Sequence, residues 1–183
     1  MAKNKKQGFE TRAIHAGQEA DPATGAVMMP IYTSSTFKQE SPGVHKGYDY
    51  SRSGNPTRKA FEECMASLED GIKGFGFSSG VAAISACVEL LEPGDHVIAM
   101  DDLYGGTVRL FNEIKTKSQG INITYVDMTD FDNVEKAYTD KTKMIFVETP
   151  TNPLLKIADL EKIAHFAKEK KILSVCDNTF AST

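Results

Sequence analysis

The sequence predicts an α/β fold built on a mainly parallel sheet and preceded by an irregular N-terminal arm. From residue 56 onward, apolar strand-like segments alternate with helical patterns along the chain. Strands separated by helices need crossover connections, which place them parallel in one sheet. Residues 1–55 show no sustained period and contain scattered turn formers, which indicates an arm that packs on a partner or serves a functional site.

The regular part is expected to begin with a helix. Asn55 can cap it, Pro56 suits its first position, apolar residues recur at helical spacing up to Leu68, and Gly71 can end it. The expected strands are 73–77, 96–100, 121–127, 143–148 and 172–177, and the further expected helices are 81–91, 106–117, 131–138 and 160–170.

Composition narrows the class of protein. The chain has 183 residues, 40% hydrophobic and 25% charged, with a net charge of −4 and both signs interspersed, which is typical of a globular protein without affinity for nucleic acid or acidic membranes. No apolar run reaches the length of a membrane span, and no signal peptide is evident. Cys64, Cys87 and Cys176 are expected to be reduced core thiols of a cytoplasmic protein, and the histidines show no metal-binding spacing.

Polar and turn residues follow four of the expected strands. They are "SSG" (78–80), "DDLYGGT" (101–107), "ETPTNP" (148–153) and Asp177. Open parallel sheets bind ligands beyond the carboxyl ends of their strands. The sequence therefore predicts a ligand site at this edge of the sheet.

The segment 78–80 opens a helix and can hold an anion on free backbone N–H groups, with Gly80 allowing close approach. Taken alone, the segment favours an ordinary turn with a serine cap. Gly74, Gly76 and Gly80 also approach a dinucleotide-binding fingerprint. That pattern needs its third glycine at Ser79 and a strand before Gly74, so it is disfavoured.

Tyr104 and Asp177 could complete such a site. Tyr104 precedes two glycines, so its ring could lie flat on a planar ligand, although it could also be a partly buried loop residue. Asp177 ends an apolar strand, where it could keep a heterocyclic nitrogen protonated or simply cap the next turn. An anion site, a stacking ring and a carboxylate together describe a pocket for a phosphorylated pyridine.

Five motifs in order carry a family resemblance: "YDYSRSGNPTR", "SSGVAA", "MDDLYGGT", "ETPTNPLLKI" and "VCDNTF". With them, the chain from residue 11 to its end resembles the pyridoxal-phosphate (PLP) enzymes of cysteine and methionine metabolism. The resemblance implies an aspartate-aminotransferase-like fold (PLP fold type I). In it, residues 1–55 form the arm and 56–183 an incomplete large domain, without the C-terminal part of that domain and without the small domain.

The resemblance also implies roles for individual residues. Tyr104 would stack on the PLP ring and serve catalysis, and the cofactor would further contact Gly80, Val81, Asn152, Asp177 and Thr179. Of these, Gly80 and Val81 would bind the phosphate, Asn152 the phenolic oxygen, Asp177 the ring nitrogen and Thr179 the ring's other side. Tyr50 and Arg52 would reach the PLP phosphate of a neighbouring subunit, which implies a dimer that shares its active sites within a homotetramer.

One departure from the family pattern concerns the lysine that holds PLP covalently. The family carries it in a Ser-x-Thr-Lys-like motif after the aspartate, and the residues that follow Asp177 here contain no lysine. Lys143 is the first residue of the strand expected at 143–148 and is expected to be solvated. The resemblance therefore implies the N-terminal part of an enzyme, inactive by itself.

Within the family, "YSRSGNPT" is more similar to cystathionine γ-synthases and γ-lyases than to the enterobacterial cystathionine β-lyases. Methionine γ-lyases usually have a cysteine in place of Gly106. The expected function is γ-replacement or γ-elimination at a C–S or C–O bond of a small amino-acid substrate. The alternatives are a cystathionine β-lyase, methionine γ-lyase or O-acetylhomoserine sulfhydrylase, or a non-catalytic fragment that acts through protein contacts.

Overall fold

The computed structural model describes residues 7–182 and divides them into two compact units. One holds the chain up to Gly76 and the other holds Phe77–Ser182. The helix that was expected to open the large domain belongs by its contacts to the N-terminal unit. The boundary after residue 55 stays a prediction.

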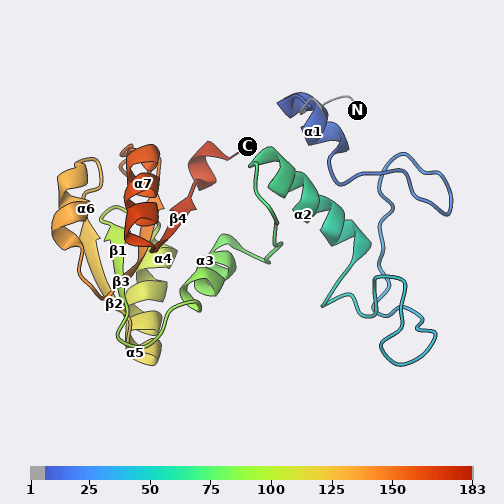
Figure 1. Ribbon diagram of the computed structural model, residues 1–183, viewed down its shortest axis with the longest axis horizontal. Helices are drawn as coiled ribbons and strands as arrows, with labels where there is room; N and C mark the ends of the chain where they lie inside the picture. Colours follow the sequence, from blue (N-terminus) through green and yellow to red (C-terminus); the bar gives the residue numbers. More distant parts are fainter. Residues whose placement is uncertain (1–6, 183) are drawn as a thin grey trace. The chain divides into compact units, whose positions relative to one another are not determined.

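The C-terminal unit is built on a four-stranded sheet (Figure 1). The strands lie in the order β2-β1-β3-β4, and all three neighbouring pairs are parallel. This confirms the predicted parallel sheet, and four of the five expected strands are present. Their bounds are β1 His96–Met100, β2 Asn122–Val126, β3 Thr142–Glu148 and β4 Leu173–Asp177.

The crossovers between these strands are helical, as expected. Strands β1 and β2 are joined by one continuous helical run, in which a π-helical segment separates two α-helical ones. α6 contacts β2, and α7 contacts β3 and β4. The bounds are α3 Gly80–Val88, α4 Gly105–Arg109, the π-helix Leu110–Lys115, α5 Thr116–Gln119, α6 Phe131–Ala137 and α7 Leu160–Lys170.

The two central strands, β1 and β3, lie in the hydrophobic core. Every residue of β1 is buried, and Lys143 is the one exposed residue of β3. The sequence of a strand that has neighbours on both sides and helices on both faces is a nearly continuous run of apolar residues. Phe111 of the π-helix meets Phe146 of β3 edge to face, with ring centroids 5.2 Å apart. The edge strands β2 and β4 are only partly buried.

The segment 73–77 differs from its prediction, because it forms no strand in the described structure. A Cβ on Gly74 would lie 2.2 Å from the carbonyl oxygen of Glu62, so this backbone is packed directly on α2 (Pro56–Leu68). The Gly76 N–H donates to Glu62 Oε1 at 2.8 Å. The two glycines therefore serve close packing on a helix, and neither the strand nor the dinucleotide fingerprint is formed.

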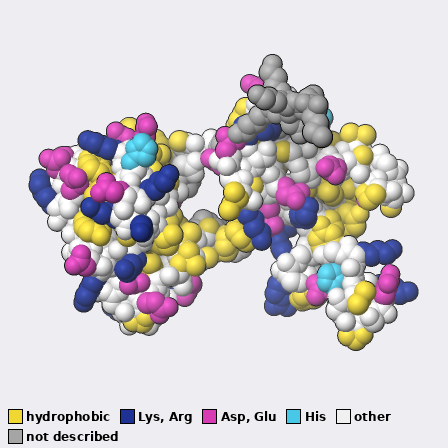
Figure 2. Space-filling view, in the orientation of Figure 1, with side chains coloured by type: hydrophobic (Ala, Val, Ile, Leu, Met, Phe, Trp, Pro, Cys, Tyr) yellow, Lys and Arg dark blue, Asp and Glu magenta, His cyan; other side chains and the backbone are white. Residues whose placement is uncertain are grey.

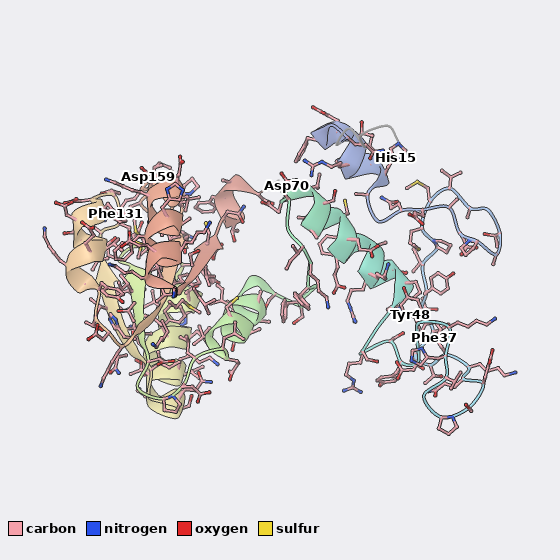
Figure 3. The ribbon with its side chains drawn as sticks, in the orientation of Figure 1. His15, Phe37, Tyr48, Asp70, Phe131 and Asp159 are labelled. Carbon is pink, nitrogen blue, oxygen red and sulfur yellow. The ribbon has the colours of Figure 1, made fainter. Side chains whose placement is uncertain are left out.

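The N-terminal unit is irregular except for two helices. The predicted α2 is confirmed with its cap, since Asn55 Oδ1 accepts from the Thr57 N–H at 2.9 Å and Pro56 is the first residue. A short helix α1, Phe9–His15, was not expected. Arg12 on α1 pairs with Asp70 at 2.8 Å, just beyond the end of α2. Phe37 and Tyr48 bring distant parts of the arm together, with ring centroids 5.6 Å apart (Figure 3).

The charged surface agrees with the expected mixture of both signs, whereas one cysteine lies outside the core. Side chains of both charges are interspersed over the face of the C-terminal unit seen in Figure 2. Within residues 7–182, no helix has the length and apolar character needed to cross a membrane. None of the three cysteines is in a disulfide, but Cys176 is exposed rather than in the core, because it lies on the edge strand β4.

His96 joins three strands at the start of β1. Its Nδ1 lies 2.8 Å from the Thr142 hydroxyl on β3, and its Nε2 lies 2.9 Å from the Thr124 hydroxyl on β2. Burial lowers the pKa of His96 from its ordinary value of 6.5. The neutral ring is thus the form that this position favours.

We expect His96 to make folding stability depend on pH. Its pKa is lower in the folded than in the unfolded protein, so its contribution is complete above about pH 6.5 and is lost as the pH falls. Urea unfolding from about pH 8 to about pH 5 should therefore cost the wild type more stability than His96→Gln. His165→Gln, at an exposed position on α7, is the control and should follow the wild type. Parallel curves for wild type and His96→Gln would contradict the prediction.

Candidate functional site

A cavity of about 360 Å³ lies at the carboxyl edge of the sheet, within the C-terminal unit. It is lined by residues that follow β1, β3 and β4 and by the start of α3. The six residues of this unit that were singled out from the sequence all line it: Gly80, Val81, Tyr104, Asn152, Asp177 and Thr179. The parallel sheet therefore brings together side chains that are far apart in the sequence.

The start of α3 presents free backbone donors to this cavity. Ser79 caps the helix, and its Oγ accepts from the Ala82 N–H at 3.2 Å. The N–H groups of Gly80 and Val81 have no partner among residues 7–182, as the first turn of a helix requires. A Cβ on Gly80 would meet nothing within 4 Å. The serine cap and the capacity to hold an anion thus coexist.

Tyr104 stands just before α4 and is 46% exposed. Its carbonyl oxygen accepts from the Thr107 N–H at 2.9 Å and so starts the helix. Its ring lies over Gly106, where a Cβ would be only 2.4 Å from ring atom Cε1. A glycine at position 106 is therefore required for this placement of the ring.

Asp177 ends β4 and uses one oxygen locally. Its Oδ1 accepts from the Thr179 N–H at 3.1 Å and from the Thr179 hydroxyl at 2.6 Å. This confirms the turn-capping interpretation. Its Oδ2 accepts no hydrogen bond from the described residues, so it stays available to a ligand in the cavity. Capping and ligand binding are compatible, because they use different oxygens.

Glu148 also lines the cavity and was missed in the sequence. It ends β3 directly opposite Asp177 in the register of β3 and β4, and it is 4% exposed. Its Oε2 accepts from the Tyr104 N–H at 2.9 Å. Burial, reinforced by the negative charges of Asp177 and Asp102, raises the pKa of Glu148. The signal that singled out Asp177, a carboxylate at the end of an apolar strand, also applied to Glu148.

The loop that carries Asn152 is anchored by Asp102, the second residue after β1. Asp102 Oδ2 accepts from the Thr151 hydroxyl at 2.5 Å and from the Leu154 N–H at 2.9 Å. Thr151 is fully buried, and its hydroxyl in turn accepts from the Lys156 N–H at 2.8 Å. The position of Asn152 therefore depends on an aspartate from a different strand end.

Lys156 fixes the far end of the same loop. Its ammonium group lies 2.8 Å from carboxylate oxygens of both Asp101 and Asp127. These ion pairs raise the pKa of Lys156 to about 12 and, together with hydrogen bonds from Thr129, lower that of Asp127 to about 2. Loops after β1, β2 and β3 are thus tied together by charge beside the cavity.

Tyr50 and Arg52 lie in the N-terminal unit and are exposed. Arg52 Nη2 donates to the Tyr50 hydroxyl at 2.7 Å, and the guanidinium carbon lies 5.2 Å from the ring centroid. Their side chains therefore lie together. Their expected role in a neighbouring subunit stays a prediction.

Lysine is not among the residues that line the cavity in the described part of the chain. Lys143 is exposed on β3, which confirms that it is solvated. The polar and aromatic groups that line the cavity include two backbone N–H donors, the rings of Tyr104 and Phe180, an amide and two carboxylates. This set suits a planar anionic ligand with a basic ring nitrogen.

Comparison with known proteins agrees with this description. The family model for the Cys/Met metabolism PLP-dependent enzymes matches residues 10–183. A cystathionine beta-lyase of Coxiella burnetii is 60% identical over 98% of this chain and 46% of its own length. A cystathionine gamma-lyase of Dictyostelium discoideum is 50% identical over 94% of this chain and 44% of its own. The chain thus spans about half the length of these curated relatives.

Solved structures show the same fold. The cystathionine gamma-lyase of Lactobacillus plantarum complexed with L-serine is 48% identical, with a TM-score of 0.89 over 94% of this chain and 45% of the other. The metB protein of Corynebacterium glutamicum is 46% identical, with a TM-score of 0.93 over 96% of this chain and 46% of the other. Fold, cavity and sequence thus agree, and the chain belongs to the family of PLP-dependent enzymes of cysteine and methionine metabolism.

Proposed function

We propose that the cavity at the carboxyl edge of the sheet binds pyridoxal 5′-phosphate. One observation carries the proposal: donors for an anion, an aromatic ring and a carboxylate oxygen without a partner in residues 7–182 line one cavity. The N–H groups of Gly80 and Val81 would receive the phosphate. Tyr104 would lie against the ring, with Thr179 on its other side.

The two polar groups at the strand ends would set the electronic state of the cofactor. Asp177 Oδ2 would pair with the ring nitrogen, while Oδ1 keeps its bonds to Thr179. Asn152, on its anchored loop, would approach the phenolic oxygen of the ring. Bound PLP supplies an electron sink for charge that develops on an amino-acid substrate, and a protonated ring nitrogen deepens that sink.

The proposed activity is cleavage or replacement at a C–S or C–O bond of a small amino acid, of the cystathionine γ-synthase or γ-lyase type, in the cytoplasm. The relatives that bear these names support it. Cystathionine β-elimination is the second candidate, because a relative named for it is 60% identical. The product distinguishes the two lyases, since β-elimination of cystathionine releases pyruvate and γ-elimination releases 2-oxobutyrate.

We expect Asp177→Asn to leave the fold intact and to lower turnover of the active enzyme by about 100-fold or more. The amide oxygen can still accept from Thr179, but it carries no charge to keep the ring nitrogen protonated. Steady-state kinetics and circular dichroism are the measurements. Asp132→Asn, an exposed position on α6, makes the same change of charge away from the cavity and should retain activity. Near-normal turnover of Asp177→Asn with PLP bound would reduce Asp177 to a cap.

We further propose that the 183 residues alone do not catalyse turnover. The basis is that no lysine lines the cavity within the described residues. Covalent attachment of PLP and transfer of the substrate's α-proton both need such an amine. Borohydride reduction of the chain with PLP, followed by mass spectrometry, should find no single lysine labelled in stoichiometric amount. Stoichiometric labelling of one lysine would refute this.

Tyr50 and Arg52 are proposed to serve the PLP phosphate of a neighbouring subunit in a homotetramer, from an arm that ends at residue 55. The support is their position in an exposed, largely irregular segment, where the guanidinium and the phenol are already held together. A planar guanidinium can bind phosphate through two parallel N–H bonds. In isolation, the Arg52–Tyr50 contact would be an ordinary surface interaction.

Complementation between two defective enzymes tests this sharing of sites. Arg52→Ala and Asp177→Ala should each be nearly inactive. When they are mixed and re-annealed, a mixed dimer with shared sites has one doubly defective site and one intact site. Activity should then return to about half of wild type per mixed dimer. If Arg52 serves its own subunit, every site keeps one defect and mixing restores nothing.

A further inference from the structure

We propose that Glu148 is a positioning residue, whose buried carboxylate holds the loop of Tyr104 against the end of β3. This inference rests on the proposed binding of PLP. Glu148 would not contact the cofactor directly, but it would fix the ring of Tyr104 beside the cofactor. The contact joins the ends of two neighbouring parallel strands, β1 and β3.

The carbonyl oxygen of Tyr104 is held by the Thr107 N–H, and the Tyr104 N–H is held separately by Glu148. The Tyr104 N–H precedes α4 and takes no part in the helix, so it needs an acceptor, and Glu148 Oε2 supplies one at 2.9 Å. The side chain of Tyr104 is half exposed, with Gly106 beneath the ring. The hydrogen bond to Glu148 therefore fixes the residue that would stack on the cofactor.

Glu148 also faces the second loop of the site. Glu148 and Asn152, which lies on the loop after β3, line the same cavity. The Glu148 carboxylate is thus bonded to the loop of Tyr104 and lies beside the loop of Asn152. Glu148 itself forms part of the cavity wall.

The environment of Glu148 disfavours the ionised form of its carboxyl group. It is 4% exposed, and no cation pairs with it among residues 7–182. The charged groups that act on it are Asp177 on β4 and Asp102 after β1, both negative. Lys156, the cation of the neighbouring loop, is paired with Asp101 and Asp127 instead. A buried acid kept against such a cost is typical of functional rather than stabilising positions.

The pKa of Glu148 is higher in the folded protein than its ordinary 4.5, so its unfavourable effect on stability grows as the pH rises above about 4.5. Replacing it with an uncharged isostere should therefore stabilise the protein at neutral pH. A residue retained only for stability would show the opposite result.

Two variants test the role of Glu148, with Glu135→Gln, exposed on α6, as the control for loss of charge. Glu148→Ala removes the acceptor, and Glu148→Gln keeps one oxygen that can accept. Hydrogen exchange of the Tyr104 amide is followed by NMR of protein labelled with ¹⁵N-tyrosine, without cofactor. Urea unfolding at pH 7 and titration with PLP complete the measurements.

We expect the Tyr104 amide of Glu148→Ala to exchange about tenfold faster and its dissociation constant for PLP to rise about tenfold. Glu148→Gln should recover part of both losses and have a higher urea midpoint than wild type at pH 7. The control should match wild type in all three measurements.

Two results would overturn the inference alone: unchanged Tyr104 exchange in both variants, or faster exchange with unchanged PLP affinity. If the wild type itself fails to bind PLP, the proposed function falls, and this role of Glu148 falls with it. The wild-type titration therefore distinguishes the two failures.

Discussion

The parallel register of β3 and β4 places Glu148 opposite Asp177, and the rest of the candidate site depends on this pairing. In a parallel sheet every strand points its carboxyl end to the same edge. Residues 101–104, 148–152 and 177–179 therefore meet there although they are distant in sequence. A shift of one residue in that register would turn the two carboxylates away from each other.

The loops around this edge are held by polar contacts because the strands beneath them are apolar. Asp102 anchors the loop of Asn152, and Lys156 ties the loops after β1, β2 and β3 together. Asp101, Asp102, Asp127 and Lys156 thus form their hydrogen bonds and ion pairs with groups of these loops. Asp177 Oδ2, the side-chain amide of Asn152 and the N–H groups at the start of α3 are among the groups left for a ligand. The protein thus separates the groups that build the site from those that would bind.

The sequence predicted this edge of the sheet well, because strand ends can be located from apolar runs and turn residues. Asp177 and Tyr104 stood out as polar or aromatic residues at such ends. The role of Glu148 could not be predicted in the same way, because it depends on the Tyr104 N–H, a backbone group from another strand end. The strand predicted for residues 73–77 was wrong for a related reason. The glycines of this segment pack on α2, and the local sequence does not distinguish such a packed segment from a short strand.

The most direct measurement of the central claim is a crystal structure of the protein with PLP bound. We expect the phosphate to lie against the N–H groups of Gly80 and Val81, and the ring nitrogen to lie within hydrogen-bonding distance of Asp177 Oδ2. Tyr104 should lie against the ring, with its N–H still bonded to Glu148. PLP bound away from the start of α3, or a ring nitrogen with no contact to Asp177, would contradict the account.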